Sequence, residues 1–132
     1  MRVASQIITN VGPNYESFIV GSIIMYDIAY CLNISTDLGL YELYHQIEFF
    51  NVTVTAISNS AYVNLELFYN VSILQPTKSV TTYQTMLANA VSSGKFTAYL
   101  QTTAAITPNA TALLHAASSS VAYGKLIDYV LI

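Results

Sequence analysis

The chain has 132 residues, of which 54% are apolar and only 8% are charged, and its net charge at neutral pH is −3. This length predicts a single domain over residues 1–132, and four basic residues are too few for the positive patch that nucleic-acid binding requires. Because ordinary soluble domains are about a quarter charged, the surface must consist of Ser, Thr, Asn, Tyr and apolar atoms. Such a surface is covered by glycans, covered by partner proteins, or poorly soluble.

The only cysteine, Cys31, excludes a disulfide within the chain. It lies in an apolar run over residues 18–32, so we expect a buried thiol, with an intermolecular disulfide as the alternative. Asp27 interrupts this run, which is shorter than the roughly 18–20 residues needed to cross a bilayer, so we expect no membrane insertion. We expect no signal peptide either, so a secreted protein would be represented here by its mature form or by an excerpt.

The first strand is expected over residues 2–11, where Gly12 and Pro13 end it and Asn14 can cap a helix. The helix is expected to continue to about residue 32. Apolar spacing predicts that its buried stripe consists of Phe18, Ile19, Ser22, Ile23, Tyr26, Ala29 and Tyr30. Residues 31–39 are expected to be a connector, and residues 40–46 a short helical turn.

Residues 46–58 and 61–74 alternate between apolar and polar side chains, which predicts two half-buried antiparallel strands joined by a turn at residues 58–60. In the first strand, one face is expected to hold Phe50, Val52, Val54 and Ala56, and the other Asn51, Thr53 and Thr55. In the second, the apolar face is expected to hold Val63, Leu65, Leu67, Tyr69, Val71 and Ile73, opposite Asn64, Glu66, Asn70 and Ser72.

After Pro76, a second helix is expected from Thr81, interrupted at Gly94 and continued by a short helix over residues 96–105. Its expected stripe consists of Tyr83, Met86, Leu87, Ala90 and Val91, and the short helix is expected to continue through Phe96 and Leu100. Residues 109–117 are expected to be mostly loop, and residues 119–132 a last alternating strand. The order predicts an α+β, ferredoxin-like βαββαβ sandwich, with two helices on one face of an antiparallel sheet and the other face open.

The sequence predicts no enzymatic activity, no metal site and no cofactor. His45 and His115 lack metal-ligand spacing, and the seven carboxylates are scattered, so that Asp27 and Glu66 would meet only by the accident of folding. No nucleophile elbow, P-loop or dinucleotide fingerprint is present. Acylphosphatases share the βαββαβ order, but they need an arginine in a phosphate-cradling loop, and Arg2 lies at the start of the first strand.

Four of the nine asparagines, Asn33, Asn51, Asn70 and Asn109, begin Asn-X-Ser/Thr triplets. Asn33 and Asn109 fall in expected loops, while Asn51 and Asn70 fall on the polar faces of expected strands. All four are therefore predicted N-glycosylation sites. The alternative is that these asparagines simply occupy turns and polar strand positions in a chain rich in Ser and Thr.

Eleven tyrosines accompany this low charge. Tyrosine buries a large ring while its hydroxyl stays hydrated, so it suits interfaces and carbohydrate stacking. About half of them, such as Tyr62, Tyr99 and Tyr123, are expected to fill the core or the strands. The remainder favour a subunit that packs against neighbouring copies, and long strands at sheet edges favour pairing between subunits.

Several segments, including residues 4–17, the Thr-rich strands, residues 83–105 and residues 118–123, resemble the repeated extracellular domains of mastigoneme-related proteins from heterokont algae. The nearest shared pattern is AV-SSG-x-F-x-x-x-L, here residues 90–100. SEA domains have the same predicted element order. The resemblance implies a secreted, glycosylated structural module without catalytic residues. Asn59-Ser60 stands where self-cleaving SEA domains have Gly-Ser, so self-cleavage is not expected, and flanking Pro/Thr/Ser linkers are absent apart from residues 75–77.

Together these features predict an extracellular or cell-surface structural protein. In the leading hypothesis it is a glycosylated subunit of a filament or surface appendage that forms a homopolymer through tyrosine-rich and strand-edge contacts. The alternative is a carbohydrate- or surface-binding adhesion module that does not polymerise. The glycan type, the helical symmetry and the covering of the open sheet face stay open at this point.

Overall fold

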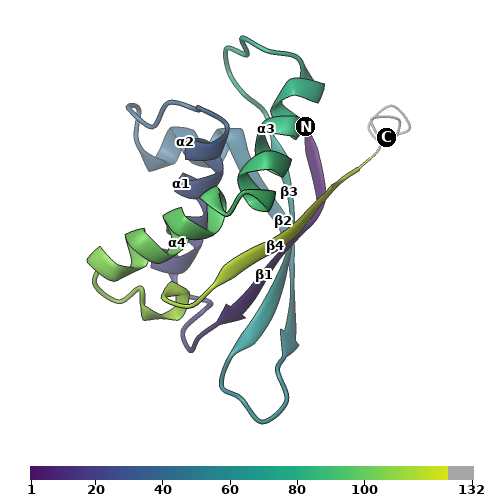
Figure 1. Ribbon diagram of the computed structural model, residues 1–132. Helices are drawn as coiled ribbons and strands as arrows, with labels where there is room; N and C mark the ends of the chain where they lie inside the picture. Colours follow the sequence, from purple (N-terminus) through teal and green to yellow (C-terminus); the bar gives the residue numbers. More distant parts are fainter. Residues whose placement is uncertain (125–132) are drawn as a thin grey trace.

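The computed structural model describes residues 1–124, which form a four-stranded antiparallel sheet with four α-helices on one of its faces (Figure 1). The elements in chain order are β1 (Arg2–Val11), α1 (Phe18–Cys31), α2 (Leu40–Gln46), β2 (Ile47–Ala56), β3 (Val63–Val71), α3 (Val80–Ser92), α4 (Lys95–Ile106), a 3-10 turn (Thr111–Leu113) and β4 (Ala117–Tyr123). The strands lie in the order β2-β3-β1-β4. The predicted α+β class and antiparallel sheet are confirmed.

The predicted βαββαβ order is wrong, because both helical connections contain two helices and the order is β-α-α-β-β-α-α-β. In the second connection Gly94 has a φ of +84° and ends α3, and its N–H donates to the Val91 carbonyl. In the first, Asn33 (φ +56°) ends α1, and Gly39 (φ +87°) precedes α2. A left-handed residue interrupts the helical hydrogen bonds, so the chain restarts as a separate helix in a new direction.

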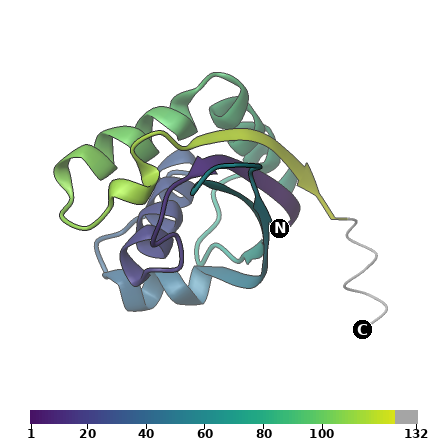
Figure 2. The same ribbon diagram turned by 90° about the horizontal axis from the view of Figure 1, so that it is seen from below.

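The helices lie on the concave face of the curved sheet (Figure 2). Burial alternates along β3 as its sequence predicts, because its apolar side chains face the helices. The buried side chains of β3 are Val63, Leu65, Leu67, Tyr69 and Val71. Between them, Asn64, Glu66, Phe68 and Asn70 are half-buried on the opposite side, which we call the open face.

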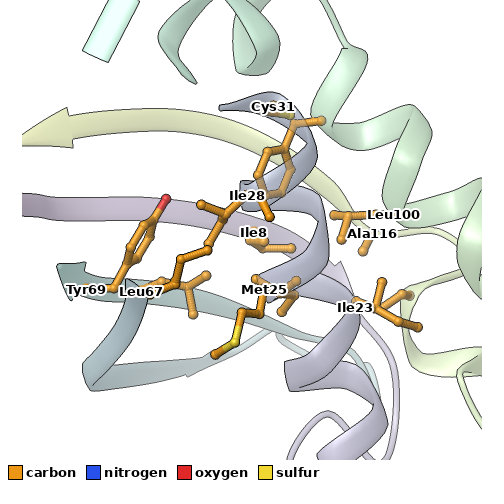
Figure 3. Packing of buried hydrophobic residues seen from close by; sticks show 14 of the residues in the cluster. Ile8, Ile23, Met25, Ile28, Cys31, Leu67, Tyr69, Leu100 and Ala116 are labelled. Atoms are coloured by element: carbon orange, nitrogen blue, oxygen red, sulfur yellow. The ribbon is translucent and has the colours of Figure 1, made fainter. Parts of the chain in front are cut away.

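Helix α1 is the centre of the core, and its predicted stripe is only partly correct. Phe18 and Tyr30 are 66% and 51% exposed, whereas Asp27 is fully buried. Nearly every residue of α1 is apolar, so the sequence does not define one face. The helix lies between the sheet and α4. Figure 3 shows Leu67 and Tyr69 of β3 on one side of it and Leu100 of α4 on the other.

The predicted stripe of α3 is confirmed. Tyr83, Leu87, Ala90, Val91, Phe96 and Leu100 are buried, and Met86 packs against them. The side chain of Ser79 caps α3 by accepting a hydrogen bond from the backbone N–H of Thr82 (3.1 Å). Ser17 caps α1 in the same way, so this helix begins three residues later than the Asn14 cap predicts.

A β-bulge in β2 changes the predicted face of one residue. The register with β3 shifts between Phe49 and Asn51, and the extra residue Phe50 turns to the open face. There its ring lies 6.3 Å from that of Phe68, and the Arg2 guanidinium lies 4.8 Å from its centroid. The prediction that Phe50 shares a face with Val52 and Val54 is therefore wrong.

The last strand starts two residues earlier than predicted, at Ala117, and pairs with β1. The predicted strand over residues 119–132 is confirmed as far as Tyr123. Residues 125–132 lie outside the described part of the chain.

Candidate functional site

Strand β2 is, together with β4, one of the two edges of the described sheet. Within residues 1–124 it has a neighbouring strand on one side only, β3. Ile47 is buried at its start, but Val52 and Val54 are 45% and 42% exposed although they point to the helix side of the sheet. An exposed edge with apolar side chains offers backbone hydrogen bonds and apolar surface at the same place.

The different lengths of strand and helix explain this exposure. A strand of 10 residues such as β2 spans about 33 Å, whereas α1, with 14 residues, spans only about 21 Å. Helix α2 packs only near the beginning of β2. The hairpin of β2 and β3 therefore extends past the helical layer (Figure 1).

A groove of about 410 Å³ lies between α1 and the uncovered part of β2. Its walls and floor are formed by Val20 and Ile24 of α1, Val52 and Val54 of β2, and Leu65 and Leu67 of β3. Gly21 also lines this β2–α1 groove, and a Cβ atom built on it would contact nothing within 4 Å. The groove is almost wholly apolar, and Glu16 is the one charged side chain among its lining residues.

The four predicted glycan acceptors lie outside the lining of this groove. Asn33 and Asn109 are exposed near opposite ends of α1, both with positive φ, as expected of asparagines in turns. Asn51 is exposed on β2 and pairs with Phe68 of the open face. Asn70 is half-buried in β3, between Arg2 on β1 and Glu48 on β2.

These positions predict unequal glycan occupancy in a host that glycosylates secreted proteins. Asn33, Asn51 and Asn109 can carry a glycan without a change in packing, and we expect all three to be occupied. Asn70, flanked by two strands, is expected to have the lowest occupancy. Peptide mass spectrometry after enzymatic deglycosylation in oxygen-18 water measures the occupancy of each site directly. An intact mass of 14.4 kDa, the mass of the bare chain, would contradict the prediction.

Asp27 and Cys31 form a buried polar pair one turn apart on α1. The Cys31 Sγ donates to Asp27 Oδ1 (3.4 Å), while Asp27 Oδ2 has no hydrogen-bond partner among residues 1–124. Burial raises the pKa of the Asp27 carboxyl to about 8. Burial and then the neighbouring Asp27 charge raise the pKa of the Cys31 thiol to about 12, so the thiol is an unreactive core group. The predicted burial of Cys31 is confirmed.

The structure does not bring the other candidate groups together. Asp27 lies in the core, whereas Glu66 is on the open face and accepts a hydrogen bond from Ser5 (2.7 Å). His45 and His115 are both exposed, and His45 contacts the ring of Tyr41. Among residues 1–124, no group of three or more His, Cys, Asp and Glu side chains could hold a metal ion.

A second hollow, lined by Tyr26, Tyr30 and Tyr99 and bordered by Asn33, lies at the end of α1. The rings of Tyr30 and Tyr99 stack on each other at 4.9 Å, and the Lys95 ammonium lies 4.8 Å from the Tyr30 centroid. These two contacts already occupy part of the Tyr30 ring, which limits the area on which a sugar could stack.

Sequence reasoning missed the β2–α1 groove because it assigned the whole apolar face of the hairpin to the helices. A length comparison supplies the missing signal. Two strands of about ten residues are longer than a single helix can cover, so part of their apolar face has to remain open.

In the described part of the chain, no helix is both long and apolar enough to span a lipid bilayer. Comparison of the chain with protein-family models, curated proteins and solved structures gave no match.

Proposed function

We propose that the protein is a structural subunit of a glycosylated extracellular filament or surface appendage, which assembles with its own copies through the edge of β2. The observation that carries the proposal is the exposure of Val52 and Val54 beside an apolar groove. In a monomer these apolar groups are exposed to water, and assembly would bury them.

The resemblance to mastigoneme-related extracellular domains supports the same proposal. So does the strand order β2-β3-β1-β4, which is the spatial order of the split βαβ, or ferredoxin-like, arrangement of SEA domains. We propose that this chain elaborates that arrangement with a second helix in each connection. Exposed Tyr41 and Tyr44 on α2 add tyrosine-rich contact surface.

A carbohydrate- or surface-binding module that does not polymerise is the second candidate. The tyrosine-lined hollow at the end of α1 favours it, since aromatic rings and hydroxyls are common in sugar sites. The ring contacts of Tyr30 with Tyr99 and Lys95 weaken this candidate.

The substitution Val54→Glu tests the role of the edge. A carboxylate in the apolar contact is expected to weaken self-association roughly 100-fold, because it must lose its hydration when the surfaces meet. The matched control is Ile106→Glu, since Ile106 is apolar and 80% exposed at the end of α4. Sedimentation velocity of the folded proteins over a concentration series gives the measurement. Equal weakening by both substitutions, or by neither, would contradict a contact through β2.

A further inference from the structure

We propose that residues 126–132 of a second copy of the chain bind along the edge of β2 and place their apolar side chains in the β2–α1 groove. This inference rests on the proposed self-assembly and names the segment that the groove receives. It makes the contact between subunits one of strand addition, in which backbone hydrogen bonds supply affinity and side-chain pockets supply specificity.

The composition of the segment matches the groove. Residues 125–132 read KLIDYVLI, and Ile127, Tyr129 and Leu131 are spaced two apart. In an extended segment such residues share one face, so three large apolar side chains would point into the groove together. Lys125, which directly precedes the segment, is opposite in charge to Glu16, which lines the groove.

Within residues 1–124, no strand pairs with the outer edge of β2, so this edge can accept a strand. The groove lies on the helix side of β2, and its floor residues Leu65 and Leu67 already belong to the sheet. A strand paired with β2 therefore continues the sheet and the groove at once. Asn51 belongs to the same strand, but it pairs with Phe68 of the open face, so a glycan on it projects away from the groove.

The reach of the chain favours a second copy over the same copy. Tyr123, Val3, Tyr69 and Phe49 form one row across the four strands, so the end of β4 is about 14 Å from the beginning of the groove. On the concave face, helices fill the direct path from the end of β4 to the groove. The alternative path crosses the open face and turns around the edge of β2.

The direction of β4 also makes it harder for the segment to reach the groove of its own copy. Strand β4 ends beside Val3, at the end of the sheet where β2 begins, whereas the hairpin turn lies at the other end (Figure 1). Eight extended residues span at most about 28 Å. After the crossing and the turn, too little length remains for Ile127, Tyr129 and Leu131 of the same copy to reach Val52 and Val54. The segment of a neighbouring copy has no such limit.

A tail that binds in the groove of the next copy joins two different surfaces. Repetition of such a heterologous contact produces an open fibre when the rotation between copies does not close a ring. The inference therefore accounts for polymerisation from a single type of contact.

Two full-length variants test the proposal in combination. Gly21→Phe fills the groove from α1, where the added side chain meets no atom of the folded subunit at its Cβ. The second variant carries Ile127→Asp, Tyr129→Asp and Leu131→Asp and leaves the groove intact. We expect each variant alone to associate at least roughly 100-fold more weakly than the wild type. Mixed in equal amounts, they should form a heterodimer that does not grow, because one tail and one groove remain.

Gly21→Ala and Asp128→Asn are the matched controls, and both should assemble like the wild type. Val54→Glu replaces Gly21→Phe as the groove variant if the phenylalanine disturbs folding. Sedimentation velocity distinguishes the outcomes. A tail variant that polymerises by itself, or a mixture without a heterodimer, overturns the role of residues 126–132 and leaves assembly through other contacts in place. A wild type that is monomeric at every concentration contradicts the proposed function itself.

Discussion

Replacing Asp27 with asparagine is expected to abolish a loss of stability that the wild-type protein undergoes between about pH 4 and about pH 8. The carboxyl group is fully buried, and one of its oxygens has no hydrogen-bond partner in the described part of the chain. Burial raises its pKa from an ordinary value of 3.8 to about 8, an effect that the Cys31 hydrogen bond and the Lys95 charge only partly offset. The folded protein therefore holds Asp27 protonated at neutral pH.

The sign of the effect follows from the protons bound in each state. Between about pH 4 and about pH 8, the folded chain keeps the Asp27 proton and the unfolded chain releases it. The contribution of this group is thus fully present below pH 4 and declines by about 1.4 kcal/mol per pH unit as the pH rises. The total change is on the order of 5 kcal/mol, against about 5–15 kcal/mol for the stability of a typical domain.

Urea unfolding at several pH values between 4 and 9 measures this contribution. Asparagine resembles the neutral carboxyl group, so the free energy of unfolding of Asp27→Asn should be nearly independent of pH where that of the wild type falls. Asp37→Asn is the matched control, because Asp37 is exposed in the loop before α2. If the wild type and Asp27→Asn show the same slope, Asp27 does not hold its proton in the folded state.

Replacing Gln6 with leucine is expected to destabilise the fold by about 2–4 kcal/mol, because it leaves two buried hydroxyls without a partner. The Tyr69 hydroxyl donates to Gln6 Oε1 (2.5 Å), and Gln6 Nε2 donates to Ser118 Oγ (3.0 Å). Gln6 and Tyr69 are fully buried and Ser118 is nearly so. The side chain of Gln6 thus connects three neighbouring strands, β3, β1 and β4, inside the core.

A double-mutant cycle separates this network from simple packing. Tyr69→Phe alone should cost about 1–2 kcal/mol, because it leaves Gln6 Oε1 without a donor. The variant with both Gln6→Leu and Tyr69→Phe should be less destabilised than the sum of the two, by about 1–2 kcal/mol, since both partners are removed together. Ser119→Ala, which removes an exposed hydroxyl from β4, is the control. Strict additivity would show that the hydrogen bond contributes nothing to stability.

Most of the strands could be predicted from the sequence, because alternation reports directly which face of a strand is buried. The apolar face of β3 was predicted residue by residue from Val63 to Val71. The bulge at Phe50 could not be predicted, since a one-residue register shift leaves the residue types unchanged and is fixed only by pairing with β3.

Helix α1 shows where periodicity stops being informative. With so few polar residues in the helix, several orientations bury similar apolar area, and contacts with the sheet and α4 decide which one occurs. The burial of Asp27 depends on that orientation. The β2–α1 groove likewise depends on where α1 ends relative to β2, which is a property of packing and not of either sequence segment.

Electron microscopy of the wild-type protein, produced in a host that glycosylates it, tests most directly whether the protein is a filament subunit. We expect helical fibres in which one subunit forms each repeat and the sheets of adjacent subunits continue through β2. Monodisperse particles of single-subunit size at high concentration would contradict this account.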